Sequence, residues 1–171
     1  MPGTGQPVLA YLGLGSNLGD RRQTLHDAQE RLDKGPGLRI LRRSSIVESA
    51  PLGVLDQPWF LNCVLEVETD LEPDHLLQRI KSIELELGRR PSPRWSARAI
   101  DIDILLYDDQ RIDDPELVVP HPEMWHRRFV LEPLAELLPD LRGPDGKSVR
   151  ERTAELSAEQ VIRQPLPATG G

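Results

Sequence analysis

Cysteine is almost absent from this chain of 171 residues, and Cys63 alone cannot form an internal disulfide. Proteins without disulfides are typical of reducing compartments, so we expect a cytoplasmic protein. The four histidines show no zinc-ligand spacing, and no cysteine pair accompanies them. A structural zinc site is therefore not expected.

Long apolar runs and an excess of basic residues are also missing. No apolar stretch reaches the roughly 20 residues of a transmembrane helix, and residues 1–7 lack the basic and apolar regions of a signal peptide. We therefore expect no membrane association. The net charge of −7 disfavours a nucleic-acid-binding surface, because such surfaces are normally basic. An anionic substrate would have to be held by local positive charges.

The length favours one domain with a core of its own, which we expect to act as a monomer. We place this domain at residues 1–163. Residues 164–171 (Gln-Pro-Leu-Pro-Ala-Thr-Gly-Gly) are expected to form a flexible tail.

Hydrophobic periodicity predicts four strands and two helices before residue 108. The strands are expected at residues 8–14, 38–49, 59–69 and 100–107. One helix follows an N-cap at Asp20 and ends at residues 35–37, and the other runs from Pro73 to a C-cap at Gly88. The order βαββαβ predicts an α+β protein with a ferredoxin-like core, in which helices cover one face of an antiparallel sheet. The other face is then open to a functional site.

The residues after 108 predict smaller additions to this core. We expect an extended piece at residues 117–120 and a kinked or broken helix that contains Pro133. A turn at residues 144–147 predicts a C-terminal hairpin, and a final helix follows from about Val149.

Two glycine patterns resemble nucleotide-binding motifs but do not match them. Gly13 and Gly15 could begin a dinucleotide fingerprint, yet Gly19 comes one residue too late, and a tight turn over residues 15–20 explains them better. The end of a P-loop is suggested by residues 146–148, but Gly143 is too close to them.

The strongest chemical signal lies at residues 94–106. Asp101 and Asp103 alternate with isoleucines, so both carboxylates project from one face of the expected strand, with Cα atoms roughly 6.6 Å apart. Paired carboxylates with open coordination positions suit Mg²⁺. Four arginines precede them without an intervening acid, and guanidiniums suit phosphate oxygens. They are Arg89, Arg90, Arg94 and Arg98. This combination predicts a polyphosphate site.

The paired aspartates by themselves are also compatible with three different roles. They could form an ordinary solvated face that pairs with neighbouring arginines. They could bind a nucleotide sugar, as in many glycosyltransferases, or belong to a module that binds a nucleotide without catalysis.

The strand at residues 59–69 carries a second candidate. Phe60 and Asn62 share one face, so together they could stack on a flat heterocycle and bind its edge. Alternatively, Phe60 belongs to the core and Asn62 caps a backbone group.

Four motifs together carry a resemblance to a known family. They are residues 15–19 (Gly-Ser-Asn-Leu-Gly), residues 51–62 (Pro-Leu-Gly followed by Asp-Gln-Pro-x-Phe-x-Asn), residues 94–105 (Arg-Trp-x-x-Arg-x-x-Asp-x-Asp-Ile-Leu), and residues 119–129 (Val-Pro-His-Pro followed by Arg-x-Phe). The chain resembles the 6-hydroxymethyl-7,8-dihydropterin pyrophosphokinases of folate biosynthesis over roughly residues 8–149.

The resemblance implies transfer of diphosphate from ATP to the hydroxymethyl group of 6-hydroxymethyl-7,8-dihydropterin, with release of AMP. It implies that Asp101 and Asp103 hold two Mg²⁺ ions and that Arg89 and Arg98 are catalytic. It also implies two sets of binding residues. ATP would be bound by Glu84, Arg89, Arg98, Ile104, His121 and Arg127, and the pterin by Ser49, Ala50, Leu52, Phe60, Asn62, Trp95 and Phe129.

Overall fold

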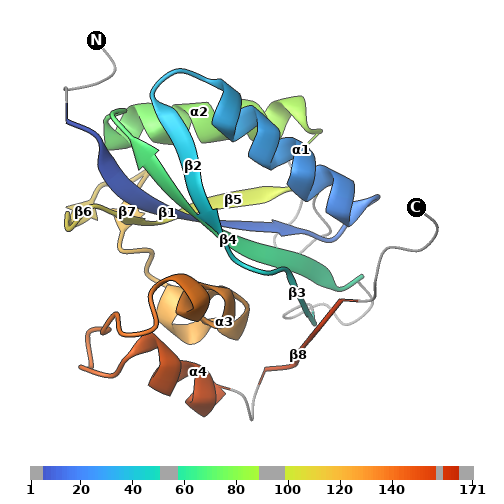
Figure 1. Cartoon of the computed structure of the whole chain (residues 1–171), viewed down its shortest axis with the longest axis vertical. Helices are drawn as coiled ribbons and strands as arrows, with labels where there is room; N and C mark the ends of the chain where they lie inside the picture. The colour runs from blue at the N-terminus through green and yellow to red at the C-terminus, as the bar shows by residue number, and fades with distance from the viewer. Residues whose placement is uncertain (1–5, 51–57, 89–98, 157–159, 166–171) are drawn as a thin grey trace.

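A six-stranded antiparallel sheet forms the centre of the part of the chain that the computed structural model describes, residues 6–50, 58–88, 99–156 and 160–165. Helices lie on both faces of this sheet (Figure 1). In chain order the elements are β1 (Val8–Ser16), α1 (Arg21–Lys34), β2 (Leu38–Arg43), β3 (Val47–Ser49), β4 (Phe60–Thr69), α2 (Pro73–Glu86), β5 (Asp101–Tyr107), β6 (Ile112–Asp113), β7 (Val118–Val119), the 3-10 helix η1 (Met124–His126), α3 (Arg128–Leu137), α4 (Val149–Leu156) and β8 (Ile162–Arg163).

The strand order confirms the predicted ferredoxin-like core. β1 pairs with β4 on one side and β5 on the other, and β2 and β3 both pair with β4, in every case antiparallel. The single strand predicted at residues 38–49 is wrong in detail, because it divides into β2 and β3. Ser44 lies at the division, where its N–H and its Oγ bond to Val64 instead of continuing the ladder of β2.

The first face of the sheet packs on α1 and α2 (Figure 1). Both helices present apolar residues at helical spacing to the core, as predicted. Asp20 caps α1 by accepting the N–H of Gln23 at 3.1 Å, and Gly88 follows α2 with φ +94°, a conformation that glycine adopts without strain. The buried residues of this core include Leu25, Ala28, Leu32, Leu76, Ile80 and Ile83.

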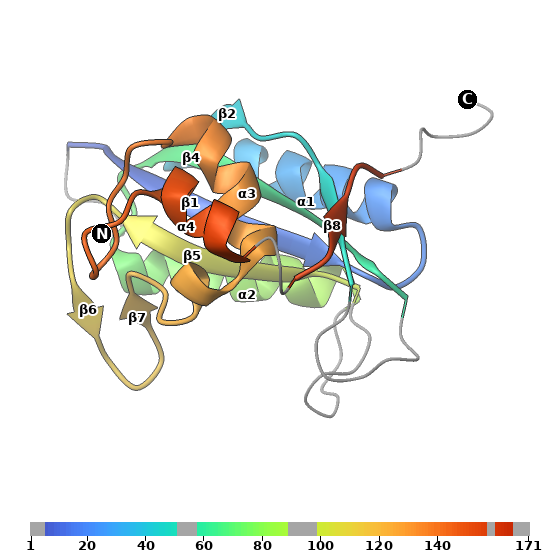
Figure 2. The same cartoon turned by 90° about the horizontal axis from the view of Figure 1, so that it is seen from below.

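The second face is covered in part by α3 and α4, whose position Figure 2 shows from below. Tyr11, Val64 and Leu105 of the sheet pack against Leu131 of α3 and Val149 of α4. The helix predicted through Pro133 is α3, and α4 begins at the predicted Val149. Because these helices leave part of the second face open, polar side chains of β3, β4 and β5 can reach a ligand there.

A buried polar network crosses the sheet beneath α3. Glu66 accepts the Tyr11 hydroxyl at 2.5 Å and two N–H groups of Arg42 at 2.7 and 3.0 Å. Arg42 also donates to the carbonyl of Leu137 at the end of α3. Burial, together with Glu66, raises the pKa of Tyr11 to about 12. The network therefore attaches α3 to three neighbouring strands through charge-assisted bonds.

Three further details differ from the sequence predictions. β1 extends to Ser16, so Gly15 and Ser16 are strand residues and not part of a tight turn. The strands β6 and β8 were not predicted, and each contains two residues. The predicted C-terminal hairpin is a loop closed by one bridge between Arg142 and Ser148.

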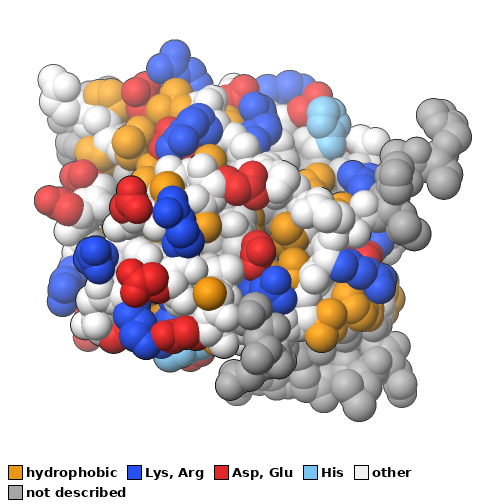
Figure 3. Space-filling model, turned by 60° about the horizontal axis from the view of Figure 1, so that its bottom comes forward, with side chains coloured by type: hydrophobic (Ala, Val, Ile, Leu, Met, Phe, Trp, Pro, Cys, Tyr) orange, Lys and Arg blue, Asp and Glu red, His pale blue; other side chains and the backbone are white. Residues whose placement is uncertain are grey.

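The described surface carries charges of both signs. Figure 3 shows acidic and basic side chains interspersed over the described part of one face. Among the described residues, no helix combines the length and the apolar composition needed to cross a bilayer. Most of the predicted tail at residues 164–171 lies outside the described residues, and the single-domain boundary stays a prediction.

Candidate active site

The two aspartates of β5 share one face, as the alternation predicted. Ile100, Ile102 and Ile104 are 0–5% exposed and belong to the core under α1 and α2. Asp101 and Asp103 therefore lie on the second face, and the side chain of Asp103 is 48% exposed. The two carboxylates are neither separated by the sheet nor enclosed in hydrocarbon, so they can bind a ligand together.

Two glycines of β1 separate the aspartates from the candidates on β4. Gly13 lies opposite Asp103 and Gly15 lies opposite Asp101, and on its other side Gly15 lies opposite Asn62. Directly opposite residues of antiparallel strands share a face, so the second face has no side chain on β1 at these positions. With strands about 4.8 Å apart, the aspartates and Asn62 lie roughly 10 Å apart across a strip of β1 that has no side chains of its own. The side chain of Leu105 lies over Gly13, and those of Asn62 and Phe60 lie over Gly15.

The opposite wall of this strip is formed by β3 and β4. Asn62 donates from Nδ2 to the Ser49 hydroxyl at 2.7 Å, and both residues are buried. Phe60 lies opposite Ser49 in the register of the two strands and is half-buried. Asn62 therefore bonds a side chain and does not cap a backbone group through this contact, and its Oδ1 lies close to Gly15.

His121 brings a third group to the aspartates. Its backbone N–H donates to the carbonyl of Leu105 at 3.0 Å, which attaches the loop around His121 to the outer edge of β5. Its Nε2 lies 4.0 Å from Oδ1 of Asp103. Burial lowers the pKa of His121 below its ordinary value and Arg127 acts in the same direction, whereas Asp103 opposes them.

The tautomer of His121 follows from its other nitrogen. The N–H of Glu123 donates to Nδ1 at 3.1 Å, so a neutral imidazole carries its proton on Nε2. The donor side of His121 therefore faces Asp103.

The next two candidates stand at the start of α3. Arg127 is the N-cap residue, and its guanidinium carbon lies 5.7 Å from the centre of the Phe129 ring. Both side chains are half-buried. The first turn of α3 lies near β3, because the N–H of Arg128 donates to Gln160 and the N–H of Ala50 donates to the carbonyl of the next residue, Val161.

Glu84 and Ile104 have different surroundings from the other ATP candidates. Glu84 is 6% exposed and its Oε2 accepts the N–H of Ile102 at 2.9 Å, so it satisfies a backbone donor on the outer edge of β5. The side chain of Ile104 belongs to the core, which leaves only its backbone for a ligand. Of the remaining candidates, Ala50 is half-buried beside Ser49.

Four predicted site residues lie outside the described residues. They are Leu52, Arg89, Trp95 and Arg98. Their roles stay predictions.

The aspartates fit a magnesium site in which substrate supplies further ligands. Among the described residues, no group of three or more histidine, cysteine or acidic side chains could hold a metal ion by itself. Mg²⁺, however, is commonly bound by one or two carboxylates together with phosphate oxygens and water. Asp101 and Asp103, on an open part of one sheet face, provide that donor set.

Sequence reasoning missed several residues around the site. Gly15 was interpreted as a turn residue, although it lies in β1 against Asn62 and Phe60. Gln160 and Arg163 were not singled out, and each contacts a wall of the site from the C-terminal end of the chain. Only the pairing of distant strands reveals these contacts, so no local pattern could have predicted them.

Comparisons with known proteins agree with this geometry. The family description "7,8-dihydro-6-hydroxymethylpterin-pyrophosphokinase (HPPK)" matches residues 11–139. A 2-amino-4-hydroxy-6-hydroxymethyldihydropteridine pyrophosphokinase of Methylorubrum extorquens is 46% identical over 154 residues, covering 90% of this chain and 97% of the relative. The protein of the same name in Pseudomonas aeruginosa is 44% identical over 155 residues, covering 91% of this chain and 96% of the relative.

A solved structure supports the fold. The crystal structure of Plasmodium falciparum HPPK-DHPS with pteroate has a TM-score of 0.70 at 17% identity, covering 90% of this chain. The present chain spans 43% of that longer protein. The matched region contains Asp101, Asp103 and the candidates on β3, β4 and α3, and the chain belongs to the 7,8-dihydro-6-hydroxymethylpterin-pyrophosphokinase family.

Proposed function

We propose that the chain transfers diphosphate from ATP to the hydroxymethyl group of 6-hydroxymethyl-7,8-dihydropterin, releasing AMP, as a step of folate biosynthesis. The observation that carries this proposal is the arrangement of the second sheet face. Asp101 and Asp103 on β5 and the Ser49–Asn62 pair on β3 and β4 share one sheet face, on either side of a strip of β1 that has glycine at positions 13 and 15. One end of this strip suits phosphates with their cation, and the other suits a flat heterocycle.

In this proposal Asp101 and Asp103 hold two Mg²⁺ ions together with ATP. When bound, these ions neutralise phosphate oxygens on both sides of the bond that breaks. His121 directs its Nε2–H towards the same region and can donate to a phosphate oxygen without adding a full charge. Arg127 adds a guanidinium beside it, and Arg89 and Arg98 supply further positive charge by analogy with the family.

The pterin is assigned to the wall formed by β3, β4 and the start of α3. Asn62 offers an amide to the polar edge of the ring, and Ser49 fixes the orientation of that amide. Phe60 and Phe129 stack on the two faces of the ring, and Ala50, Leu52 and Trp95 complete the pocket. Alignment of the two substrates, with little covalent chemistry from the protein, then supplies most of the rate.

The remaining parts of the proposal concern organisation. We propose one catalytic domain at residues 1–163, active as a monomer in the cytoplasm, with ATP and the pterin as its partners. Glu84 and the backbone of Ile104 are assigned to the ATP side, because Glu84 of α2 bonds to β5 and Ile104 belongs to β5.

The decisive experiment is incubation with ATP, Mg²⁺ and 6-hydroxymethyl-7,8-dihydropterin, followed by measurement of AMP. We expect stoichiometric AMP and pterin diphosphate from the wild type. Asp101→Ala and Asp103→Ala should each reduce turnover by about a thousandfold or more, with an unchanged circular dichroism spectrum. Binding of ATP without AMP release would instead support a non-catalytic module, and near-normal turnover of both variants would remove the metal role.

A further inference from the structure

Residues 160–163 contact both walls that the pterin proposal requires, and we name them the C-terminal strap. They lie outside residues 11–139, which the family description matches. In Figure 1 the strand β8 of this segment runs from the side of the molecule that carries α4 towards β3. The strap therefore begins at one wall and ends at the other.

The first end of the strap is Gln160, which holds the backbone on both sides of Arg127. Its Nε2 donates to the carbonyl of His126 at 2.7 Å, and its Oε1 accepts the N–H of Arg128 at 2.8 Å. The guanidinium of Arg128 donates in turn to the carbonyl of Gln160 at 2.9 Å. One side-chain amide thus fixes the entry to α3, where Phe129 is the second residue.

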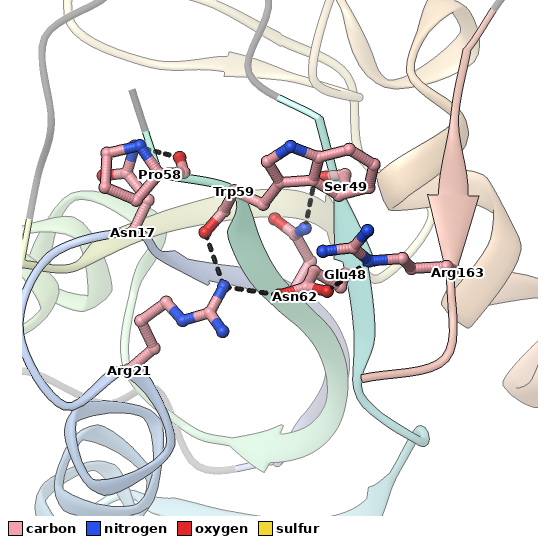
Figure 4. A network of polar contacts seen from close by, with 8 residues as sticks. All are labelled: Asn17, Arg21, Glu48, Ser49, Pro58, Trp59, Asn62 and Arg163. Atoms are coloured by element: carbon pink, nitrogen blue, oxygen red, sulfur yellow. Dashed lines mark hydrogen bonds and ion pairs between the residues drawn. The ribbon is translucent and has the colours of Figure 1, made fainter. Parts of the chain in front are cut away.

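The second end of the strap is β8, which extends the sheet beyond β3. Arg163 lies opposite Glu48 in the register, and its Nε donates to Oε1 of Glu48 at 2.5 Å (Figure 4). Its guanidinium carbon also lies 3.8 Å from the centre of the Trp59 ring. Next to this strand pair, the backbone N–H of Ala50 donates to the carbonyl of Val161 at 3.3 Å.

Glu48 connects this end to the rest of the fold. It is 5% exposed, and Arg21 of α1 donates from Nη1 to its Oε2 at 2.7 Å and to the carbonyl of Trp59 at 2.7 Å (Figure 4). Glu48 shares the α1 face with Leu61, whereas its neighbour Ser49 points to the second face. The ionic cluster therefore holds the wall from behind, without occupying the space in front of Ser49 and Asn62.

We propose that the C-terminal strap is a positioning element of the pterin site, in which Gln160 and Arg163 set the separation between the wall of Phe60 and Asn62 and the wall of Phe129. This inference rests on the proposed function. A flat ring bound between two aromatic side chains requires a fixed spacing, because stacking weakens steeply when the separation grows. α3 also packs directly on β3 and β4, and the strap adds hydrogen bonds and an ion pair that join the start of α3 to β3.

The test is a double-mutant cycle with Gln160→Ala, Arg163→Ala and the double variant in the full chain. Each single change releases one end of the strap, so we expect the KM for the pterin to rise about tenfold, with a smaller change in the KM for ATP. If the strap acts as one unit, releasing the second end adds little, and the double variant should resemble the single variants. Arg163→Lys keeps the charge beside Glu48 and Trp59, and should recover part of the affinity.

Matched controls separate this effect from a loss of stability. Arg39→Ala removes a cross-strand ion pair with Glu68 between β2 and β4. Gln23→Ala removes a hydrogen bond from the Gln23 side-chain amide to Asp27 within α1. Both should leave the KM for the pterin unchanged, and thermal unfolding identifies any variant that fails to fold.

The outcomes distinguish the two proposals. An inactive wild type would overturn the proposed function itself. An active wild type whose strap variants keep the wild-type KM for the pterin would overturn only the strap proposal. The same holds if the rise in KM of the double variant equals the product of the rises in the two single variants. If both alanine variants unfold, Arg163→Lys decides. Lysine lacks the Nε–H that Arg163 donates to Glu48, so an unchanged KM for the pterin in this folded variant would contradict the proposal.

Discussion

Replacement of Gly15 by alanine should impair pterin binding, with a loss of stability small enough for the protein to remain folded. A Cβ at this position would lie 3.0 Å from Oδ1 of Asn62 and 3.6 Å from Cδ1 of Phe60. The amide would have to move by a few tenths of an ångström. It has little room to do so, because Asn62 is 4% exposed and bonded to Ser49 at 2.7 Å.

The size of the effect follows from the hydrogen bonds that depend on this amide. Misplacing one buried amide costs about 1.5–2 kcal/mol of binding, which corresponds to a rise of about ten- to thirtyfold in the KM for the pterin. The unfolding free energy should fall by about 1–3 kcal/mol, because the close contact strains a packed interior and the reduced freedom of the unfolded chain offsets only part of that cost. The KM for ATP should be nearly unchanged, since the new methyl group faces Asn62 and Phe60.

The assay is steady-state AMP release at varied pterin concentration, together with thermal unfolding. Gly13→Ala is the matched variant, because the three atoms nearest to its Cβ would all belong to the apolar side chain of Leu105, at 3.4–3.6 Å. We expect less than about a twofold change in the KM for the pterin in that case, since an apolar side chain can adjust. Equal effects of the two variants, or a normal KM for Gly15→Ala, would refute the assignment of Asn62 to the pterin.

Three further predictions concern other parts of the molecule. Arg98→Ala should slow single-turnover diphosphate transfer much more than it weakens ATP binding, and an unchanged single-turnover rate would exclude its catalytic role. Arg42→Ala should lower the unfolding midpoint at pH 7, because the hydrogen bond from Arg42 lowers the pKa of Glu66. The difference from the wild type should narrow below about pH 4.5, because protonation of Glu66 then removes from the wild type the ion pair that the variant already lacks. Glu84→Leu should destabilise the protein by about 1–3 kcal/mol in denaturant unfolding, by leaving the N–H of Ile102 unsatisfied, whereas Glu84→Gln retains an acceptor and should lose less.

Local periodicity predicted the features that depend on one strand or helix. The alternation at residues 100–104 placed Asp101 and Asp103 on one face, because the pleat of a strand sends successive side chains to opposite sides. The same reasoning placed Asn62 and Phe60 together. The N-cap at Asp20 was predictable because its hydrogen bond spans only three residues.

Features that depend on contacts between distant residues were not predictable in this way. The strand β8 contains two residues and exists through its pairing with β3, more than 100 positions earlier. Gly15 was assigned to a turn because glycine is common there, whereas the close approach of Asn62 explains it better. In each case tertiary pairing, and not local propensity, decides the conformation.

The distribution of charge gives a physical reason why the proposed function would depend on magnesium. The chain carries a net charge of −7, and two of its acidic side chains, Asp101 and Asp103, lie where the triphosphate is expected to bind. ATP alone would be repelled by this surface, and only a nucleotide that brings cations can approach it. In the proposed function, Arg127 at the start of α3, together with Arg89 and Arg98, would act on the outer phosphate oxygens, while the aspartates would act through the cations. Removing Mg²⁺ should therefore weaken ATP binding to the wild type far more than to Asp101→Asn, because the neutral amide no longer repels the bare triphosphate.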